Sequence, residues 1–411
     1  MKYILIIGDG MADDPLEELG GKTPLEVCQK PYFDSLCERG VLGLVQTIPE
    51  GFPPGSDTAI MSIFGCDPAR YFSGRAPLEL AASGGTMPEG GACYRCNMVT
   101  LGGDESLPFG EKTMVSHSAG SIEGEESDEL IEWLFSHEEF RSMAGAAGMS
   151  VRPGSSFRHL AVQENADLTG IVLSPPHDHL NEKVGPILPA GNNNAKTLLA
   201  LMEKANELLE HHPINEKRRA EGRLPANGIW FWAEGKGARL PNFTQHYGAD
   251  GGVISAVPLC HGIAVLVGLE PISVPTATGE WDTDYEAKTR AALDVLRSHD
   301  FAAVHLEGPD EATHNHDLEH KIYSVECLSE RVLKPLCEEL RARGEDFRVL
   351  ILSDHRTFMR NGAHGATPVP FMIYDSREPA PGSGLSYSES NGEQGPFLTS
   401  GTYLMPMLFS K

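Results

Sequence analysis

The sequence predicts an α/β protein whose core is a doubly wound, mostly parallel sheet, with a smaller α+β domain inserted into it. Apolar runs without polar alternation occur at residues 3–7, 301–306 and 347–352, as is typical of strands covered on both faces. Helical patterns between the runs indicate crossover connections between parallel strands. We expect these helices at residues 24–39, 57–64, 284–298 and 318–343.

The first predicted strand, YILII, ends at Gly8-Asp9-Gly10. Further on, the helix at 57–64 begins directly after Ser56, which two prolines and a glycine precede. A serine in this place is expected to cap the helix. It could equally present its hydroxyl to a phosphoryl group, because the first turn of a helix also offers free backbone N–H groups.

The middle of the chain has a different character. It carries glycine-rich turns, a strongly acidic helix at 123–136 and a long helix at 194–211. Strands followed by an aspartate occur on both sides of this stretch. We therefore expect a discontinuous core domain, 1–88 with 226–411, and an inserted domain, 89–225.

The second and third predicted strands precede Asp310 and Asp354, as the first precedes Asp9. In doubly wound sheets the ligand lies off the carboxyl ends of the strands, so these three acids are expected to meet. Beyond them the tail is rich in Gly, Ser and Pro at 376–396 and is expected to be irregular. A last apolar stretch covers 397–409.

Composition excludes several classes of partner. The chain of 411 residues has a formal net charge of -25, which repels nucleic acid and anionic membranes. No apolar run approaches the roughly 20 residues that span a bilayer, and the opening run is too short for a signal peptide. We expect a cytoplasmic protein with reduced cysteines, since Cys93 and Cys96 have no second pair to complete a zinc site. The oligomeric state is not indicated.

Two segments place aspartate and histidine together. In PDEATH, Asp310 and His314 are four residues apart and share one face of a helix, which suits one metal ion. In SDHRTFMRNGAHG, Asp354 and His355 are adjacent at a strand end and His364 follows in a loop. The alternatives are a surface Asp–His pair and a capped turn after the strand.

A third segment, GDGMAD, adds Asp9, with Asp13 or Asp14 as the alternative acid. Asp9 is favoured because it directly follows the buried strand. Mixed Asp/His ligation suits Mn²⁺ or Zn²⁺ more than Mg²⁺, and seven ligands suit two ions with open positions. The predicted ligands are Asp9, Ser56, Asp310, His314, Asp354, His355 and His364.

Charge balance explains how Ser56 could act as a nucleophile. Two divalent ions carry +4, while three carboxylates and a serine alkoxide carry -4. The site would be neutral before substrate binds, so attack on a phosphate dianion is not strongly opposed. The metal would lower the pKa of the Ser56 hydroxyl without a histidine base.

The motifs resemble a known family. GDGMADDPLEELGGKTPLE, PPGSDTAIMSIFGCDPARYFSGRAPLE, NGIWFWAEGKG, GGVISAVPLCHGIAV, TATGEWDTDYEAK, PDEATH and SDHRTF…GAHGATPVPF are similar, in this order and across almost the whole chain, to the archaeal-type cofactor-independent phosphoglycerate mutases of the alkaline phosphatase superfamily.

The resemblance implies an activity and a division of the ligands. Two Mn²⁺-type ions would lie in the core domain, without 2,3-bisphosphoglycerate as a cofactor. Ser56 would take the phosphoryl group from 3-phosphoglycerate and return it to the other hydroxyl, giving 2-phosphoglycerate, while the inserted domain closes over the site. One ion would be held by Asp9, Ser56, Asp354 and His355, and the other by Asp310, His314 and His364.

The sequence indicates the substrate-binding residues less directly than the metal ligands. Arg75, in SGRAP, is the first phosphate candidate, because a bidentate arginine suits phosphate or carboxylate. The alternative for each of these residues is a surface salt bridge or a structural role. The further candidates are Arg158, His159, Lys236, His117, His177 and Asp178.

Other functions stay open at this point. His261 stands where the family is expected to have lysine, and GAHGATPVP replaces an expected His-Thr-x-Asp-Pro pattern. A homoserine kinase-like phosphotransferase, a phosphomonoesterase and a non-catalytic metal-stabilised binding protein are the alternatives. The last would need a lost nucleophile or ligand, and none of the seven positions is lost.

Overall fold

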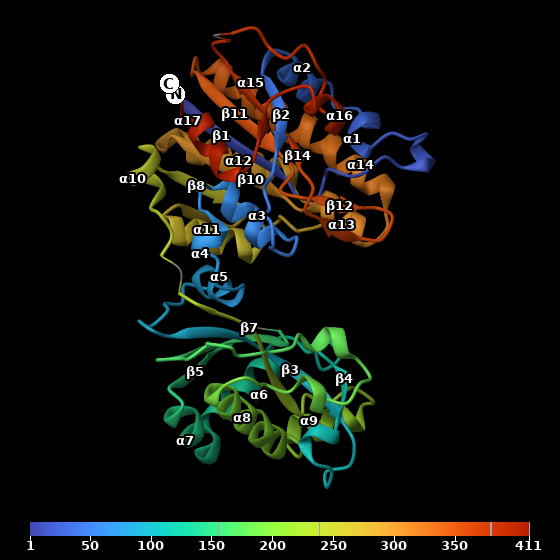
Figure 1. The fold of residues 1–411 in the computed structure, drawn as a ribbon, viewed down its shortest axis with the longest axis vertical. Helices are drawn as coiled ribbons and strands as arrows, with labels where there is room; N and C mark the ends of the chain where they lie inside the picture. Colours follow the sequence, from blue (N-terminus) through green and yellow to red (C-terminus); the bar gives the residue numbers. More distant parts are fainter. Residues whose placement is uncertain (155, 238, 379, 411) are drawn as a thin grey trace. The chain divides into compact units, whose positions relative to one another are not determined.

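The computed structural model describes residues 1–154, 156–237, 239–378 and 380–410. The chain forms two compact units, Met1–Phe72 with Arg239–Lys411, and Ser73–Ala238 (Figure 1). We call them the sheet unit and the inserted unit.

The sheet unit is built on an eight-stranded sheet with the order β15-β2-β14-β11-β1-β10-β8-β9. Among these strands, β14 alone runs antiparallel to its neighbours. The strands are β1 Lys2–Gly8, β2 Val41–Val45, β8 Gly251–Ile254, β9 Glu270–Ile272, β10 Phe301–Leu306, β11 Phe347–Leu352, β14 Val369–Asp375 and β15 Phe397–Leu398, and a separate hairpin joins β12 Arg356–Phe358 and β13 Ala363–Gly365.

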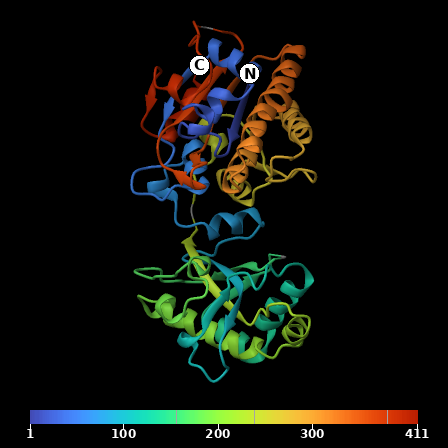
Figure 2. The ribbon, with the colours of Figure 1, turned by 90° about the vertical axis from the view of Figure 1, so that its right-hand side faces the viewer.

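Two groups of helices cover the two faces of this sheet (Figure 2). The first contains α1 Pro24–Val27, α2 Pro31–Arg39, α12 Tyr285–Ser298, α14 Leu318–Cys327 and α15 Lys334–Ala342. The second contains α3 Ser56–Ile63, α10 Phe243–Tyr247, α11 Pro258–Val267 and α17 Leu404–Phe409. The shorter helices α4 Pro68–Tyr71, α13 Gly308–His314 and α16 Glu389–Gly392 lie in the connections. The predicted fold class is confirmed.

The central strands lie where the sequence predicts them, because a strand buried on both faces appears as a continuous apolar run. β10 and β11 have the predicted bounds, and every residue in them is buried. β1 lies between these two strands and is parallel to both, with Gly8 opposite Leu306 and Ile7 opposite Leu352. The carboxyl ends of the three strands therefore meet at one edge.

Two predicted helices are interrupted at prolines. The helix expected at 24–39 ends at Val27 and restarts at Pro31, because the residue before a proline is disfavoured in the helical region. The helix expected at 318–343 continues through a π-helical segment, Leu328–Leu333, just before Pro335 in the first turn of α15. In the tail, α16 is the one named element between 376 and 396, and residue 379 lies outside the described residues.

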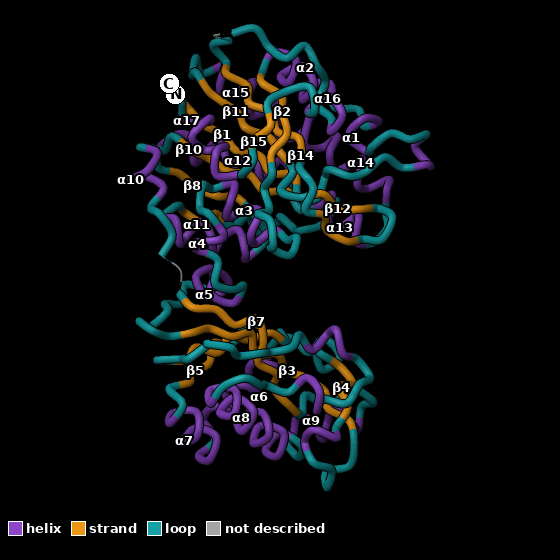
Figure 3. Tube along the Cα trace, in the orientation of Figure 1, coloured by secondary structure: helices purple, strands orange, loops and turns teal. Residues whose placement is uncertain are grey.

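The inserted unit contains an antiparallel sheet in the order β4-β3-β6-β5, and β7 also pairs with β3 (Figure 3). Helix α5 packs against β3, β6 and β7, and α8 packs against β7. Its elements are α5 Ala76–Ala82, β3 Ala92–Gly102, β4 Thr113–Ser116, α6 Glu125–Ser136, α7 Glu138–Ala146, β5 Met149–Arg152, β6 Arg158–Gln163, α8 Asn193–Leu209, α9 Pro213–Ala220 and β7 Gly228–Lys236.

The unit boundaries differ from the expected ones. The sequence placed them at 88/89 and 225/226, whereas contacts divide the chain at 72/73 and 238/239. Helix α5 and strand β7 belong to the inserted unit, because α5 packs on its sheet and β7 pairs with β3. The sheet unit is formed from two separate segments of the chain. No helix among the described residues is long and apolar enough to cross a membrane.

Candidate active site

Three acidic groups converge at the carboxyl edge of the sheet. Asp9 directly follows β1, Asp354 follows β11, and Asp310 lies in α13, which follows β10. His355 is buried together with Asp9 and Asp354, and oxygen or nitrogen atoms of the three residues lie within 4.8 Å of one another. From His355 Nε2 the distance is 3.5 Å to Asp9 Oδ1 and 3.3 Å to Asp354 Oδ2.

A second group shares His355. It combines His355 with Asp310 and His364 within the same 4.8 Å limit, and the rings of His355 and His364 stack with centroids 4.0 Å apart. His314 joins this group, since its Nε2 lies 3.1 Å from Asp310 Oδ2 and 3.0 Å from His364 Nε2. The side-chain contacts thus unite all six predicted Asp and His ligands.

Ser56 belongs to the same cluster. It is the first residue of α3, and Gly55 occupies the N-cap position. The Ser56 hydroxyl lies 3.4 Å from Asp9 Oδ2 and 3.1 Å from His355 Nε2. The expected capping role is therefore not the one that this serine has, and its oxygen points to the acidic groups.

The cluster carries unbalanced charge and unpartnered atoms. Burial raises the pKa of Asp9 well above its ordinary value, and the charges of Asp354 and Asp310 add to this. Burial also acts to raise the pKa of Asp310, but hydrogen bonds from His314 and His364 bring it below its ordinary value. Within the described part of the chain, Asp9 Oδ1 and Asp354 Oδ2 are buried without a hydrogen-bond partner. Such atoms and this donor set fit divalent cations.

A second layer behind the cluster holds Asp9 in place, and none of the sequence motifs predicts it. His305 Nε2 lies 2.9 Å from Asp9 Oδ2, and His305 Nδ1 lies 3.1 Å from Ser255 Oγ. Burial lowers the pKa of His305 to about 4, so the ring is neutral. The sequence feature that could have identified His305 is its place as a histidine inside an otherwise apolar strand, FAAVHL.

Asp13, the alternative acid of the first motif, has a structural environment. It and Lys321 are fully buried, and Lys321 Nζ lies 2.8 Å from Asp13 Oδ2. The backbone N–H of Met359 also donates to Asp13 Oδ2, at 3.1 Å. Asp14 instead forms partly exposed ion pairs with Arg356 and Arg360. Neither acid has an atom in the two candidate ligand groups.

We expect Lys321→Met to lower the free energy of unfolding by about 3–5 kcal/mol, since it leaves the Asp13 carboxylate buried without its partner. Urea denaturation of the full chain measures this change. The double variant Lys321→Met/Asp13→Asn removes both charges and is expected to recover much of the loss. A double variant no more stable than Lys321→Met would contradict the ion-pair explanation.

The inserted unit gathers arginines around one carboxylate. Arg95, which is not among the predicted residues, is buried and paired with Glu79 through two nitrogens, and it lies 4.8 Å from the centre of the Trp232 ring. Arg75 Nε lies 3.6 Å from the same carboxylate. Desolvation and the charges of Arg95 and Arg75 lower the pKa of Arg158. Three cations near one acid favour an anionic ligand.

Two candidate histidines flank this arginine cluster. The ring centroid of His177 lies 5.1 Å from that of Trp232 and 6.0 Å from that of His117. Desolvation and the charges of His177 and Arg158 lower the pKa of His117. Arg158 in turn lies over Phe157, which contacts His117 edge-on. These contacts bring Arg158, His117 and His177 into one neighbourhood.

The remaining predicted substrate-binding residues are His159, Asp178 and Lys236, which differ in their burial. His159 is fully buried, and its ring nitrogens contact Ser127 Oγ and the backbone N–H of Gly154, each at 3.1 Å. Both of its ring nitrogens therefore have partners within the inserted unit, and its substrate-binding role stays a prediction. Asp178 is exposed and lies 3.5 Å from His177 Nε2. Lys236 is exposed at the end of β7.

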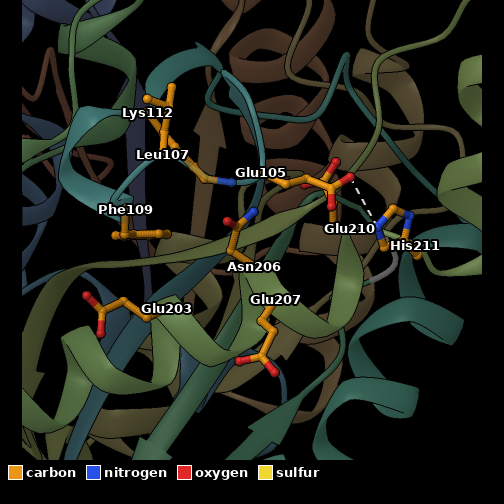
Figure 4. A pocket seen from close by; sticks show the side chains of 9 residues that line it. All are labelled: Glu105, Leu107, Phe109, Lys112, Glu203, Asn206, Glu207, Glu210 and His211. Carbon is orange, nitrogen blue, oxygen red and sulfur yellow. Dashed lines mark ion pairs between the residues drawn. The ribbon is translucent and has the colours of Figure 1, made fainter.

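A separate cavity of about 440 Å³ in the inserted unit has an acidic lining (Figure 4). None of the predicted site residues lines it, and its one marked ion pair joins His211 Nε2 to Glu105 Oε1 at 3.1 Å. An anionic ligand would be repelled there. The lining residues are Glu105, Leu107, Phe109, Lys112, Glu203, Asn206, Glu207, Glu210 and His211.

Comparisons with known proteins agree with the sequence resemblance. A family described as 2,3-bisphosphoglycerate-independent phosphoglycerate mutase matches residues 37–215. The proteins named 2,3-bisphosphoglycerate-independent phosphoglycerate mutase from Methanosarcina acetivorans and Methanothrix thermoacetophila are 41% identical over 401 residues and 43% identical over 376 residues. These alignments cover 96% of this chain and 96% of the first relative, and 92% of this chain and 91% of the second.

A solved structure supports the fold. The PH0037 protein from Pyrococcus horikoshii matches with a TM-score of 0.79 and 27% identity, over 99% of this chain and 96% of that chain. Together with the full-length relatives, this similarity covers both units of the chain. The chain therefore belongs to the 2,3-bisphosphoglycerate-independent phosphoglycerate mutase family and is an enzyme of that class.

Proposed function

We propose that the chain interconverts 3-phosphoglycerate and 2-phosphoglycerate through a phosphoserine on Ser56, with two divalent ions in the sheet unit. Mn²⁺ is the first candidate, Zn²⁺ and Mg²⁺ are alternatives, and 2,3-bisphosphoglycerate is not required. Asp9, Ser56, Asp354 and His355 would hold one ion, and Asp310, His314 and His364 the other. We also place the enzyme in the cytoplasm, where its eight cysteines, all buried and free, would stay reduced.

One observation carries this proposal. The Ser56 hydroxyl lies 3.1 Å from Nε2 of His355, the residue common to both candidate ligand groups. When bound, the ions would neutralise the carboxylates and lower the pKa of the serine hydroxyl. A serine in that position has both an activated oxygen and a place for a phosphoryl group.

The reaction requires two displacements at phosphorus. Ser56 Oγ attacks the phosphoryl group of 3-phosphoglycerate, the bond from phosphorus to the substrate O3 breaks, and O3 leaves as the hydroxyl of glycerate with the proton that the Ser56 hydroxyl has lost. The O2 hydroxyl of glycerate then attacks phosphoserine, the bond from phosphorus to Ser56 Oγ breaks, and Ser56 Oγ takes up the proton lost by O2. The Ser56 end of α3 presents first-turn backbone N–H groups, which favour a phosphoryl group. Water must be excluded between the steps, since otherwise phosphoserine is hydrolysed.

The decisive experiment incubates purified, Mn²⁺-loaded protein with 3-phosphoglycerate and follows 2-phosphoglycerate and free phosphate together. We expect 2-phosphoglycerate in the absence of added 2,3-bisphosphoglycerate. Free phosphate alone would instead identify a phosphomonoesterase. Neither product, from protein that binds two Mn²⁺ ions, would contradict the proposal and direct the search to another phosphoryl acceptor, such as homoserine.

We further propose that Arg75 and Arg158 bind the anionic groups of the substrate. Alanine at either position is expected to lower kcat/KM by about 10- to 100-fold, the value of one lost charge-assisted hydrogen bond. Steady-state kinetics with 3-phosphoglycerate measures this. Arg141→Ala, an exposed arginine of α7, is the matched control and is expected to leave kcat/KM unchanged. Equal values for all three variants would exclude the two arginines as ligands.

A further inference from the structure

One hydroxyl group connects the two candidate ligand groups. Thr357, in β12, is fully buried. Its Oγ1 lies 2.5 Å from Asp310 Oδ1 and 3.1 Å from His355 Nδ1. Asp310 belongs to one proposed ion site, and His355 is common to both groups.

The direction of these two hydrogen bonds follows from the number of protons. A carboxylate oxygen only accepts, so the single hydroxyl hydrogen of Thr357 goes to Asp310. The hydroxyl lone pair is then left for His355, whose Nδ1 must carry hydrogen and donate it. In a neutral imidazole this leaves Nε2 with its lone pair.

That lone pair is aimed at the reacting groups. His355 Nε2 lies 3.1 Å from Ser56 Oγ, 3.3 Å from Asp354 Oδ2 and 3.5 Å from Asp9 Oδ1. A metal-ligating histidine commonly has its tautomer fixed by a partner on its other ring nitrogen. Here that partner is a hydroxyl which is itself bonded to a second candidate ligand.

The hydroxyl has little freedom to move. The backbone N–H of Thr357 donates to Ala12 O at 3.1 Å, and Lys321 Nζ donates to Thr357 O at 2.7 Å. A β-carbon at Gly10 would lie 2.5 Å from Thr357 Oγ1 and 2.4 Å from Asp310 Oδ1, which only glycine avoids. Thr357 also pairs with His364 across the hairpin.

We infer that Thr357 is a positioning residue that fixes His355 in the Nδ1–H tautomer and joins the two ion sites through the sequence His355 Nδ1–H to Thr357 Oγ1–H to Asp310. This inference rests on the proposed two-ion function. It adds to that function a residue which binds no ion itself and which sets the form of the shared histidine.

The test compares Thr357→Val, which keeps the shape and removes the hydroxyl, with Thr357→Ser, which keeps the hydroxyl. Calorimetric titration of the metal-free protein with MnCl₂ is expected to show two bound ions and an affinity lowered about 10- to 100-fold in the valine variant. The serine variant is expected to regain wild-type affinity, which a purely structural role of the methyl group would not produce.

The outcomes separate the inference from the proposed function. Wild-type protein that binds fewer than two Mn²⁺ ions would contradict the two-ion proposal. Two ions bound with equal affinity by wild type and the valine variant would overturn only the role of Thr357.

A second measurement does not depend on the valine variant folding. Nitrogen-15 NMR of histidine-labelled, metal-free wild-type protein is expected to show His355 protonated at Nδ1, and the serine variant is expected to give the same signal. Protonation of His355 at Nε2 in wild type would refute the inference.

Discussion

Replacing Ser56 with alanine is expected to lower mutase activity by at least about 10³-fold, because it removes the oxygen that accepts the phosphoryl group. The contacts among the Asp and His residues of the cluster do not involve the Ser56 hydroxyl, so the fold should be unchanged. Coupled detection of 2-phosphoglycerate measures the activity. Acid-quenched wild-type protein should yield a phosphorylated peptide containing Ser56, and the variant should not.

The control for this experiment lies in the same helix. Ser62 is fully buried in α3, and its hydroxyl has no partner among the described residues. Ser62→Ala makes the same chemical change six residues away and is expected to leave activity near that of wild type. Substantial mutase activity in Ser56→Ala would exclude the phosphoserine route, whatever the metal content of the protein.

The second prediction concerns Asp9, and bound metal decides whether replacing this residue stabilises or destabilises the protein. In metal-free protein the Asp9 carboxylate is buried beside the charges of Asp354 and Asp310, which raise its pKa. Asp9→Asn removes this repulsion and is expected to stabilise the metal-free protein by about 1–3 kcal/mol. With Mn²⁺ the same change removes a ligand and most of the stabilisation that the bound ion gives. Thermal denaturation in chelator and in Mn²⁺ measures both effects.

Asp14→Asn provides the comparison, because Asp14 lies outside both ligand groups and forms partly exposed ion pairs with Arg356 and Arg360. We expect it to shift the melting temperature by a similar small amount in both conditions. If Asp9→Asn destabilised the protein equally with chelator and with Mn²⁺, Asp9 would be a structural acid and not a ligand.

The pH dependence has a definite direction. Burial and the charges of Asp354 and Asp310 hold the folded-state pKa of Asp9 in metal-free protein well above its ordinary value, so Asp9 opposes folding at neutral pH. As pH falls through the raised folded-state pKa, this destabilisation is relieved, and the relief is complete once pH is below the unfolded-state value. The difference in stability between wild type and Asp9→Asn should therefore shrink on acidification.

The fold class and the candidate ligand set follow from local sequence. Strands buried on both faces appear as continuous apolar runs, so β10 and β11 have the predicted bounds. In a parallel sheet the residues that follow such strands share an edge, which places Asp9 and Asp354 together. The spacing of Asp310 and His314 brings their side chains to 3.1 Å on one helix.

Other features depended on contacts between distant parts of the chain. His305 and Thr357 carry no motif of their own. They matter because β1 lies beside β10, and because the segment after β11 folds back to Asp310. Asp13 is held apart from the candidate ligands by Lys321, which is 308 residues away in sequence. The boundary between the units near α5 depended on the packing of this helix against the sheet of the inserted unit.

Burial pattern and short spacing in the sequence are enough to predict the three central strands, the fold class and the candidate ligands. Contacts between distant residues are needed to show which acid is paired with a lysine, which histidine is shared between two groups, and which hydroxyl orients it. These depend on hydrogen bonds and charges a few ångströms apart, formed by residues that only the folded sheet brings together.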